Sequence, residues 1–214
     1  MRALIRYGLA FVALLLIWEL GSLALGPFLL PPPAGVLAYF GRSLATRGFW
    51  ENAGASAWRA TAGLGLAWLA AFPLGLALGY GRRLDRAVSP FVFLTYPLPK
   101  IVLLPVFLTL FGLGDAPKIL LIALTAGYQI LVVTRAGAAR LDRRYLDSFR
   151  SLGGSTRQLI RHVLAPAALP DALTALKLAS GTAVAVLFMA ESFATRRGLG
   201  FLIMDAWGRG DQEE

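Results

Sequence analysis

Residues 61–80, TAGLGLAWLAAFPLGLALGY, contain no charged side chain. A helix rises about 1.5 Å per residue, so a run of this length crosses the hydrocarbon core of a bilayer, which is about 30 Å thick. Gly75 and Gly79 place two small residues four positions apart, a spacing that lets another helix pack closely. The stretch therefore predicts a membrane-spanning helix with one face for close helix packing.

The rest of the chain has the same character. It is 57% hydrophobic and 15% charged, with a mean hydropathy of +0.65, so a bilayer is the expected solvent. We predict an all-α, polytopic membrane protein with about five transmembrane helices. The further spans are expected at residues 7–25, 90–111, 118–133 and 173–193.

The order of apolar and polar stretches predicts three parts. Residues 1–29 form an N-terminal transmembrane helix, or a cleaved signal peptide if Ser22–Ala24 is a cleavage site. Residues 30–57 form an external loop with a short interfacial helix at about 34–45, after an extended run of prolines. Residues 58–214 form the core, which includes a cytoplasmic loop at 135–166.

The cations are distributed unevenly between the predicted loops. With the N-terminus in the cytoplasm, the inside stretches hold Arg2, Arg6, the arginines at 82–86 and the seven arginines of 135–161, more than the outside stretches hold. This distribution predicts a multi-pass protein of the cytoplasmic membrane with its N-terminus inside. It also accounts for much of the net charge of +9 without a nucleic-acid partner.

Several kinds of chemistry are excluded by composition. The chain has no cysteine and one histidine, His162, so thiolate metal sites and a serine-type triad are out of reach. A G-x-x-x-x-G-K-[ST] phosphate loop is also missing from the sequence. We expect no catalytic residue, cofactor or metal in this chain, and a membrane-embedded enzyme is a disfavoured alternative.

The third span is irregular. Pro97, Pro99 and Pro105 each lack a backbone donor, and Lys100 puts a cation inside an apolar stretch. Broken backbone within a bilayer is tolerated where protein or a water-filled cavity surrounds it. The segment is thus the candidate lining of a translocation pathway, although Lys100 could equally snorkel or pair with a carboxylate. The pathway candidates are Tyr96, Pro97, Pro99, Lys100 and Glu191.

The loop at 135–166 is too polar to span and strongly patterned. Asp142 can cap a helix on which Tyr145, Phe149 and Leu152 recur at i, i+4 and i+7, and Gly153-Gly154 ends that helix. This pattern predicts an exposed apolar stripe flanked by arginines. It favours a docking surface for a cytoplasmic partner, and the alternative is a loop resting on anionic headgroups.

A second helix is predicted after the glycines. Ser155 and Gln158 are spaced as a capping box, and the apolar side of the helix would carry Leu159, Ile160, Val163 and Leu164. Pro166 and Pro170 are expected to end this helix before the last span.

The motif D-S-F-R-S-L-G at 147–153, followed nine residues later by V-L-A-P at 163–166, resembles the EAA loop of binding-protein-dependent ABC importer permeases. The spacing is kept, while Asp147, Ser148, Phe149, Val163 and Ala165 depart from the usual residues. The stretches at 30–37, 96–105, 110–114 and 198–203 resemble the aliphatic-sulfonate, taurine and nitrate branch of that family.

The resemblance implies a type I ABC importer permease fold with a cytoplasmic coupling helix. It implies a partner ABC ATPase that uses ATP and Mg, an external solute-binding protein, and a second permease copy in the bilayer. The solute would be a small anion such as a sulfonate, taurine or nitrate, and an ion-coupled secondary transporter or channel is the alternative. Permeases of this branch usually continue into one more transmembrane helix, so we expect a truncated sequence or a partner that covers the gap. The implied ATPase-coupling residues are Asp147, Ser148, Phe149, Arg150, Leu152, Gly153, Gly154, Val163 and Pro166.

Overall fold

The computed structural model describes residues 2–193 and 195–209, which contain helices and connecting turns but no strand. The all-α prediction is therefore confirmed. Four helices are long and apolar enough to cross a membrane, or five if one bent pair counts as a span. In chain order the elements are α1 (Arg2–Leu25), α2 (Pro33–Ser43), α3 (Arg47–Tyr80), α4 (Arg82–Thr95), η1 (Lys100–Leu103), α5 (Leu104–Phe111), α6 (Ala116–Ala139), α7 (Arg143–Ser151), α8 (Thr156–Leu159), η2 (Ile160–Leu164), α9 (Ala165–Phe193) and α10 (Leu199–Arg209).

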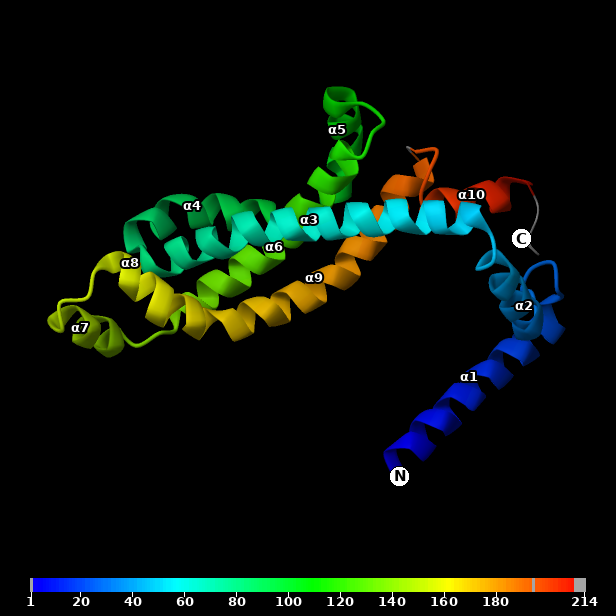
Figure 1. Ribbon diagram of the computed structural model, residues 1–214, viewed down its shortest axis with the longest axis horizontal. Coiled ribbons are helices and arrows are strands. Elements are labelled where there is room, and N and C mark those ends of the chain that lie inside the picture. The colour runs from blue at the N-terminus through cyan, green and yellow to red at the C-terminus, as the bar shows by residue number, and fades with distance from the viewer. Residues whose placement is uncertain (1, 194, 210–214) are drawn as a thin grey trace.

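The core is a bundle of α3, α6 and α9, which run alongside one another (Figure 1). Small residues let α3 and α6 approach closely: a Cβ atom on Gly75 would lie 2.7 Å from Thr134 Cβ, and one on Gly79 would lie 2.5 Å from Ala138 Cβ. The predicted packing role of Gly75 and Gly79 is confirmed. Because a larger side chain at either glycine would overlap α6, the pair sets the distance between the two helices.

Helix α1 leaves the bundle and lies near α2 (Figure 1). Most of its apolar side chains are exposed, and the indole of Trp18 donates a hydrogen bond to the carbonyl of Pro31 at 3.0 Å. Its apolar part, Ile5–Leu25, matches the predicted first span, and α2 matches the predicted short helix. The exposed surface of α1 is suited to lipid or to another chain.

Helix α3 begins earlier than predicted. It starts at Arg47, where the hydroxyl of Thr46 accepts a hydrogen bond from the backbone of Phe49. The boundary predicted between residues 57 and 58 therefore falls inside a continuous helix, and the segment predicted as an external loop ends before Arg47. The local cause is the cap at Thr46, which allows helix to form in the polar residues before the apolar run.

The third predicted span is bent, not straight. Helix α4 and the η1–α5 segment meet at an angle of 90° across a break that contains Pro97 and Pro99. Prolines remove donors from the helix and restrict the residue before them, so the chain turns there. The predicted irregularity is confirmed, and α5 projects from the side of the bundle (Figure 1).

The prediction that Pro166 and Pro170 end the helix is wrong. Helix α9 runs through both prolines, and α8, η2 and α9 together form one apolar stretch, Thr156–Phe193. Pro166 lies two residues after the end of η2. The wider π-helical turn of η2 also includes His162, the residue whose carbonyl a proline at 166 would otherwise crowd. The hairpin at 143–164 is therefore continuous with the last span.

Candidate functional site

The candidate residues lie at three levels of the bundle. The hairpin of α7, α8 and η2 lies at one end, and a polar cluster around Glu191 lies at the other end, near α10 (Figure 1). The break between α4 and η1 precedes both the hairpin and Glu191 in the chain.

The hairpin forms from local signals in the sequence. Oδ1 of Asp142 accepts a hydrogen bond from the backbone of Arg144 at 3.0 Å. Gly153 has φ +81°, the left-handed conformation that ends a helix most easily at glycine. Ser155 and Gln158 form the predicted capping box, with bonds of 3.3 and 3.0 Å between side chain and backbone. Both predicted caps are confirmed.

The predicted apolar stripe is divided. Leu152 is 86% exposed and Tyr145 is 66% exposed, whereas Phe149 is half-buried. The ring of Phe149 covers the turn, since a Cβ atom on Gly154 would lie 2.1 Å from it. Leu152 and Tyr145 are thus available to a partner, while Phe149 and Gly154 hold the turn closed.

The two arms of the hairpin are held differently. Leu164 is buried in an apolar cluster with Leu76, Ala138 and Ala168, so the second arm is part of the core. The first arm, α7, projects from the bundle (Figure 1). Its contact with α3 is a hydrogen bond from the guanidinium of Arg150 to the hydroxyl of Tyr80, with the guanidinium 5.8 Å from the ring centroid.

The remaining predicted coupling residues lie around this surface. Asp147, Ser148 and Arg150 are exposed on α7, Val163 is half-buried in η2, and Pro166 is exposed at the start of α9. Nothing in the described residues tests their contact with a partner, so their coupling role stays a prediction.

Lys100 lies at the break between α4 and η1. Its ammonium donates hydrogen bonds to the carbonyls of Thr95, Tyr96 and Leu98, at 2.5, 2.9 and 2.9 Å. It also lies 4.3 Å from the ring centroid of Tyr128. The last carbonyls of a helix lack intrahelical donors, and here the lysine supplies them. The side chain thus stabilises the bend through carbonyls, which differs from both snorkelling and pairing with a carboxylate.

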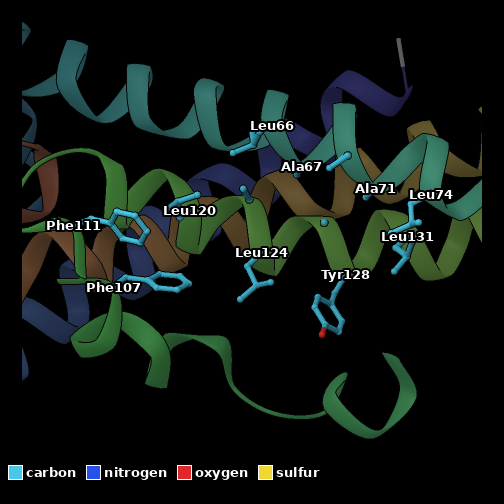
Figure 2. A pocket seen from close by; sticks show the side chains of 13 residues that line it. Leu66, Ala67, Ala71, Leu74, Phe107, Phe111, Leu120, Leu124, Tyr128 and Leu131 are labelled. Atoms are coloured by element: carbon cyan, nitrogen blue, oxygen red, sulfur yellow. The ribbon is translucent and has the colours of Figure 1, made fainter. Parts of the chain in front are cut away.

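An apolar groove of about 380 Å³ lies between α3, α5 and α6, beside this break (Figure 2). Phe107 and Phe111 of α5 face Leu66 of α3 and Leu124 of α6 across it, and the ring of Tyr128 points into the space below α6. The lining carries no charged side chain. The groove is therefore suited to an apolar surface or lipid, not to an anion.

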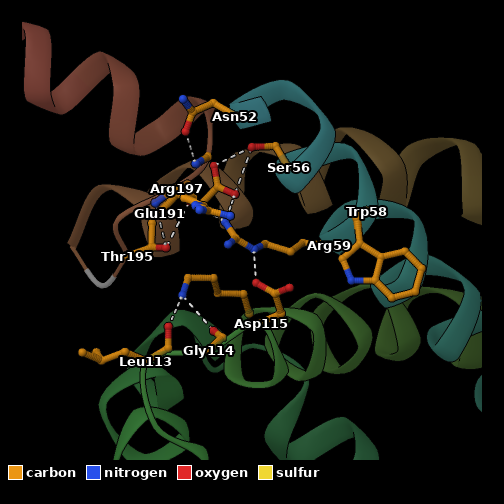
Figure 3. A network of polar contacts seen from close by, with 12 residues as sticks. Asn52, Ser56, Trp58, Arg59, Leu113, Gly114, Asp115, Glu191, Thr195 and Arg197 are labelled. Carbon is orange, nitrogen blue, oxygen red and sulfur yellow. Dashed lines mark hydrogen bonds and ion pairs between the residues drawn. The ribbon is translucent and has the colours of Figure 1, made fainter. Parts of the chain in front are cut away.

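Glu191 lies apart from the other pathway candidates, in a polar cluster at the α10 end (Figure 3). Its side chain is 1% exposed and its carboxylate accepts hydrogen bonds from Ser56 Oγ at 2.8 and 3.0 Å, Arg59 Nη1 at 2.7 Å and Gly200 N at 3.0 Å. A carboxylate with this many partners is a structural centre. This geometry favours a packing role for Glu191 over the predicted pathway role.

Arg59 connects the helices of the cluster. It is 4% exposed, and besides Glu191 it donates to Asp115 Oδ1 and to the carbonyl of Arg197, both at 2.7 Å. Lys118, also buried, donates to the carbonyls of Leu113 and Gly114 at 3.1 and 3.0 Å. Arg59 thereby joins α3 to the start of α6 and to the end of α9; Arg59 and Glu191 are buried, whereas the Asp115 side chain is 47% exposed.

Two glycines make room for this carboxylate. A Cβ atom on Gly198, which has φ +130°, would lie 2.3 Å from Glu191 Cδ, and one on Gly200 would lie 2.7 Å from Glu191 Cβ. The segment before α10 can close over the carboxylate because it carries no side chain at these positions.

Sequence reasoning missed Arg59 as a partner of Glu191, and it missed Asp115 and Lys118 as members of the same cluster. Arg59 and Lys118 entered the sequence analysis only as cations of the predicted outside stretches, and Asp115 did not enter it. A usable signal was that both Arg59 and Glu191 adjoin long apolar runs, where an ionisable group needs a partner. Within residues 2–193 and 195–209, no group of three His, Cys, Asp or Glu side chains is placed to hold a metal.

Comparison with known proteins decides the family. Residues 63–212 match the family described as the binding-protein-dependent transport system inner membrane component. The chain belongs to this family. It is a permease of the ABC importer type, which places it in the inner membrane as a multi-pass protein.

Named relatives resemble the permease along most of its length. The taurine transport system permease protein TauC of Escherichia coli is 33% identical over 93% of this chain and 74% of the relative. The putative aliphatic sulfonates transport permease protein SsuC of the same organism is 30% identical, with coverage of 91% and 75%. The formylaminopyrimidine transport permease protein ThiX of Halalkalibacterium halodurans is 30% identical, with coverage of 90% and 77%.

A solved structure has the same fold. The MetNI methionine ABC transporter, in an inward-facing conformation, superposes with a TM-score of 0.64 at 23% identity, covering 78% of this chain and 81% of the other. The predicted ABC importer permease fold is confirmed.

Proposed function

We propose that this permease moves a small anion of the sulfonate class across the cytoplasmic membrane, driven by a partner ATPase that docks on the α7–α8 hairpin. The observation that carries the proposal is the pair of exposed apolar side chains, Leu152 at 86% and Tyr145 at 66%, on an arginine-rich hairpin continuous with a membrane span. Exposed apolar groups surrounded by charge are typical of a protein interface. The permease itself catalyses nothing, and ATP and Mg are used by the partner.

The hairpin is built to transmit movement. Its second arm continues without interruption into α9, so a displacement of the docked hairpin would move the last span as one rigid element. Arg150 and Tyr80 give a second, weaker connection to α3. Alternating access requires two packings of similar energy whose balance the docked partner shifts.

The assembly follows from the surfaces that the bundle leaves uncovered. The apolar groove beside α5 and the apolar faces of α1 are surfaces that the described part of the chain leaves exposed. We place a second permease copy, lipid, or both against them. An external binding protein would deliver the solute at the α10 end, opposite the hairpin, with the N-terminus in the cytoplasm as the arginine distribution predicts.

The solute class rests on the relatives. Two of them are named for taurine and aliphatic sulfonates, which carry a sulfonate group. The permease named for formylaminopyrimidine is as similar as the second of these, so a neutral pyrimidine is the competing solute.

Docking is tested by substituting the exposed leucine. Leu152→Asp should lower capture of the partner ATPase by about 10-fold or more, because a charge replaces a buried apolar contact at an interface. Thr156→Asp is the matched control: it adds the same charge to the same hairpin, at the first turn of α8, where an acidic residue is favourable. Equal capture by wild type and Leu152→Asp would overturn the docking role.

Solute transport is tested with the assembled importer. Proteoliposomes that contain the permease, the ATPase and the binding protein should take up radiolabelled taurine or methanesulfonate only when ATP is present inside. Uptake driven by an ion gradient without ATP would instead support a secondary transporter. Uptake of formylaminopyrimidine in preference to either sulfonate would overturn the anion assignment and keep the importer.

A further inference from the structure

Lys177 is a cation in the apolar part of α9, and it lies outside the polar clusters described above. Its side chain is exposed, and within residues 2–193 and 195–209 it makes no side-chain hydrogen bond or ion pair. The other two lysines of the chain, Lys100 and Lys118, both donate to backbone carbonyls. An ionisable residue inside a span is rare and usually faces a cavity or a solute pathway.

Packing places Lys177 deep between the two ends of the bundle. Ala175 and Ala179, on either side of it in α9, share an apolar cluster with Ala67 and Ala71 of α3. That part of α3 is midway between Arg59, in the outer polar cluster, and Tyr80, beside the hairpin. Along α9 the lysine is about 21 Å from Glu191 at 1.5 Å per residue.

A groove of about 510 Å³ opens beside this lysine, between α3 and α9. Trp68, Thr61 and Gly65 of α3 form one wall, and Lys177 and Ser180 of α9 belong to the other. The hydroxyls of Thr61 and Ser180 donate within their own helices, each to a carbonyl at 2.7 Å. The ammonium of Lys177 is therefore the charge that this groove presents.

We propose that the α3–α9 groove is the solute path through the permease and that Lys177 is its contact for the anionic group of the solute. This rests on the proposed function and names the side chain that selects for negative charge. The groove at α3, α5 and α6 lacks any charge, and the Lys100 ammonium already has three carbonyl partners. In a partly dry groove a single cation attracts an anion more strongly than it does in water.

The first test measures transport by the assembled importer in proteoliposomes. Lys177→Gln should lower ATP-driven uptake of taurine about 10-fold or more, as expected for loss of a charge-assisted contact. Lys177→Arg, which keeps the charge, should stay within about threefold of wild type. ATP hydrolysis and capture of the ATPase should be unchanged in both. Arg47→Gln, which removes a cation from an exposed pair at the start of α3, is the control and should leave uptake unchanged.

Two results would overturn the role of Lys177. Taurine uptake by Lys177→Gln at the wild-type rate would show that the lysine snorkels or is dispensable. Loss of permease dimers in Lys177→Gln, measured by crosslinking, would show that the lysine pairs with a second copy instead of a solute.

The second test needs neither the partners nor the natural solute. The full chain is placed in nanodiscs, and iodide quenching of tryptophan fluorescence is compared with quenching by neutral acrylamide. The part of each signal that disappears in Trp68→Phe belongs to Trp68. Lys177→Gln should reduce iodide quenching of Trp68 and leave acrylamide quenching unchanged, whereas equal iodide quenching in both forms would overturn the proposal. If wild type shows charge-dependent iodide entry but no ATP-driven uptake, the proposed function fails and the anion site stands.

Discussion

The two ends of the bundle are stabilised in opposite ways. At the α10 end, Arg59 and Glu191 are buried, and the Glu191 carboxylate accepts hydrogen bonds from Ser56 and Arg59 of α3 and from Gly200 of α10. At the hairpin end, α7 is exposed and is joined to α3 through Arg150 and Tyr80. Long-range polar bonds therefore hold the α10 end. At the other end the ion pairs Arg135–Asp85 and Arg140–Asp171 join the spans to one another, while α7 itself is held by its local caps and the bond to Tyr80.

This difference matches what each end is expected to do. A buried charge that loses its partner is strongly destabilising, so the α10 end resists deformation. A helix with exposed apolar residues and few contacts can move as a unit when a partner binds it. The bundle thus has a stiff end, the cluster around Arg59 and Glu191, and a compliant end, the hairpin with α7.

The largest expected effect comes from breaking the stiff end. Glu191→Gln should lower the free energy of unfolding by about 3–5 kcal/mol, because it leaves the buried guanidinium of Arg59 without one of its charged partners. The measurement is denaturant-induced unfolding of the purified permease in mixed micelles. The double variant Arg59→Met, Glu191→Leu should recover much of the loss, since it removes both charges. If Glu191→Gln unfolds like wild type, the cluster is not what holds this end.

The next effect comes from the glycine over the carboxylate. Gly198→Ala should cost about 1–3 kcal/mol in backbone strain at φ +130°, and the new Cβ atom would also displace the Glu191 carboxylate. Gly208→Ala is the control, because a Cβ atom there meets nothing within 4 Å and alanine favours helix. The two variants are compared in the same unfolding assay. Equal stability would mean that the segment before α10 can relax away from α9.

The compliant end was the more predictable from sequence. Its caps at Asp142 and Ser155 and its turn at Gly153 depend on residues a few positions apart, and a spacing rule can detect them. The membrane spans were also predictable, because the length and hydropathy of an apolar run of about 20 residues can be read from one continuous stretch of sequence.

The polar cluster at the α10 end could not be predicted, because its bonds join residues that are far apart in the sequence. Arg59 bonds to Asp115 and Glu191, which are 56 and 132 positions away, and no local pattern announces a bond over such a separation. The same applies to the carbonyl-bonded Lys100, because the direction of an ammonium depends on how the chain bends. The prediction for Pro166 was wrong because the effect of this proline depends on the π-helical turn before it.

A smaller effect is expected at Gly153, the left-handed glycine of the hairpin turn. Gly153→Ala should cost about 1 kcal/mol, because the left-handed conformation is strained for alanine but a Cβ atom there meets nothing within 4 Å. The strain should appear as faster amide exchange in α7, with the midpoint of global unfolding unchanged. Gly153→Asp adds a charge to the same turn and should also abolish ATPase capture while the permease remains inserted. If Gly153→Ala lowered the free energy of unfolding as much as Gly198→Ala does, the hairpin turn would be as important for global stability as the α10 end, and the proposed difference between the two ends would be wrong.

The smallest effect isolates the tether. Tyr80→Phe removes the hydroxyl that accepts the hydrogen bond of Arg150 and keeps the ring over which the guanidinium lies. A single partly exposed hydrogen bond contributes about 0.5–1.5 kcal/mol, so α7 amides should exchange about 3- to 10-fold faster while those of α6 do not change. Tyr39→Phe is the matched control, since the Tyr39 hydroxyl has no bonded partner among the described residues and its ring also lies beside an arginine. Unchanged amide exchange in α7 would mean that the Arg150–Tyr80 bond is dispensable. The helix caps and the Phe149–Gly154 contact would then keep α7 in place, and α7 would be even less connected to α3 than the structure indicates.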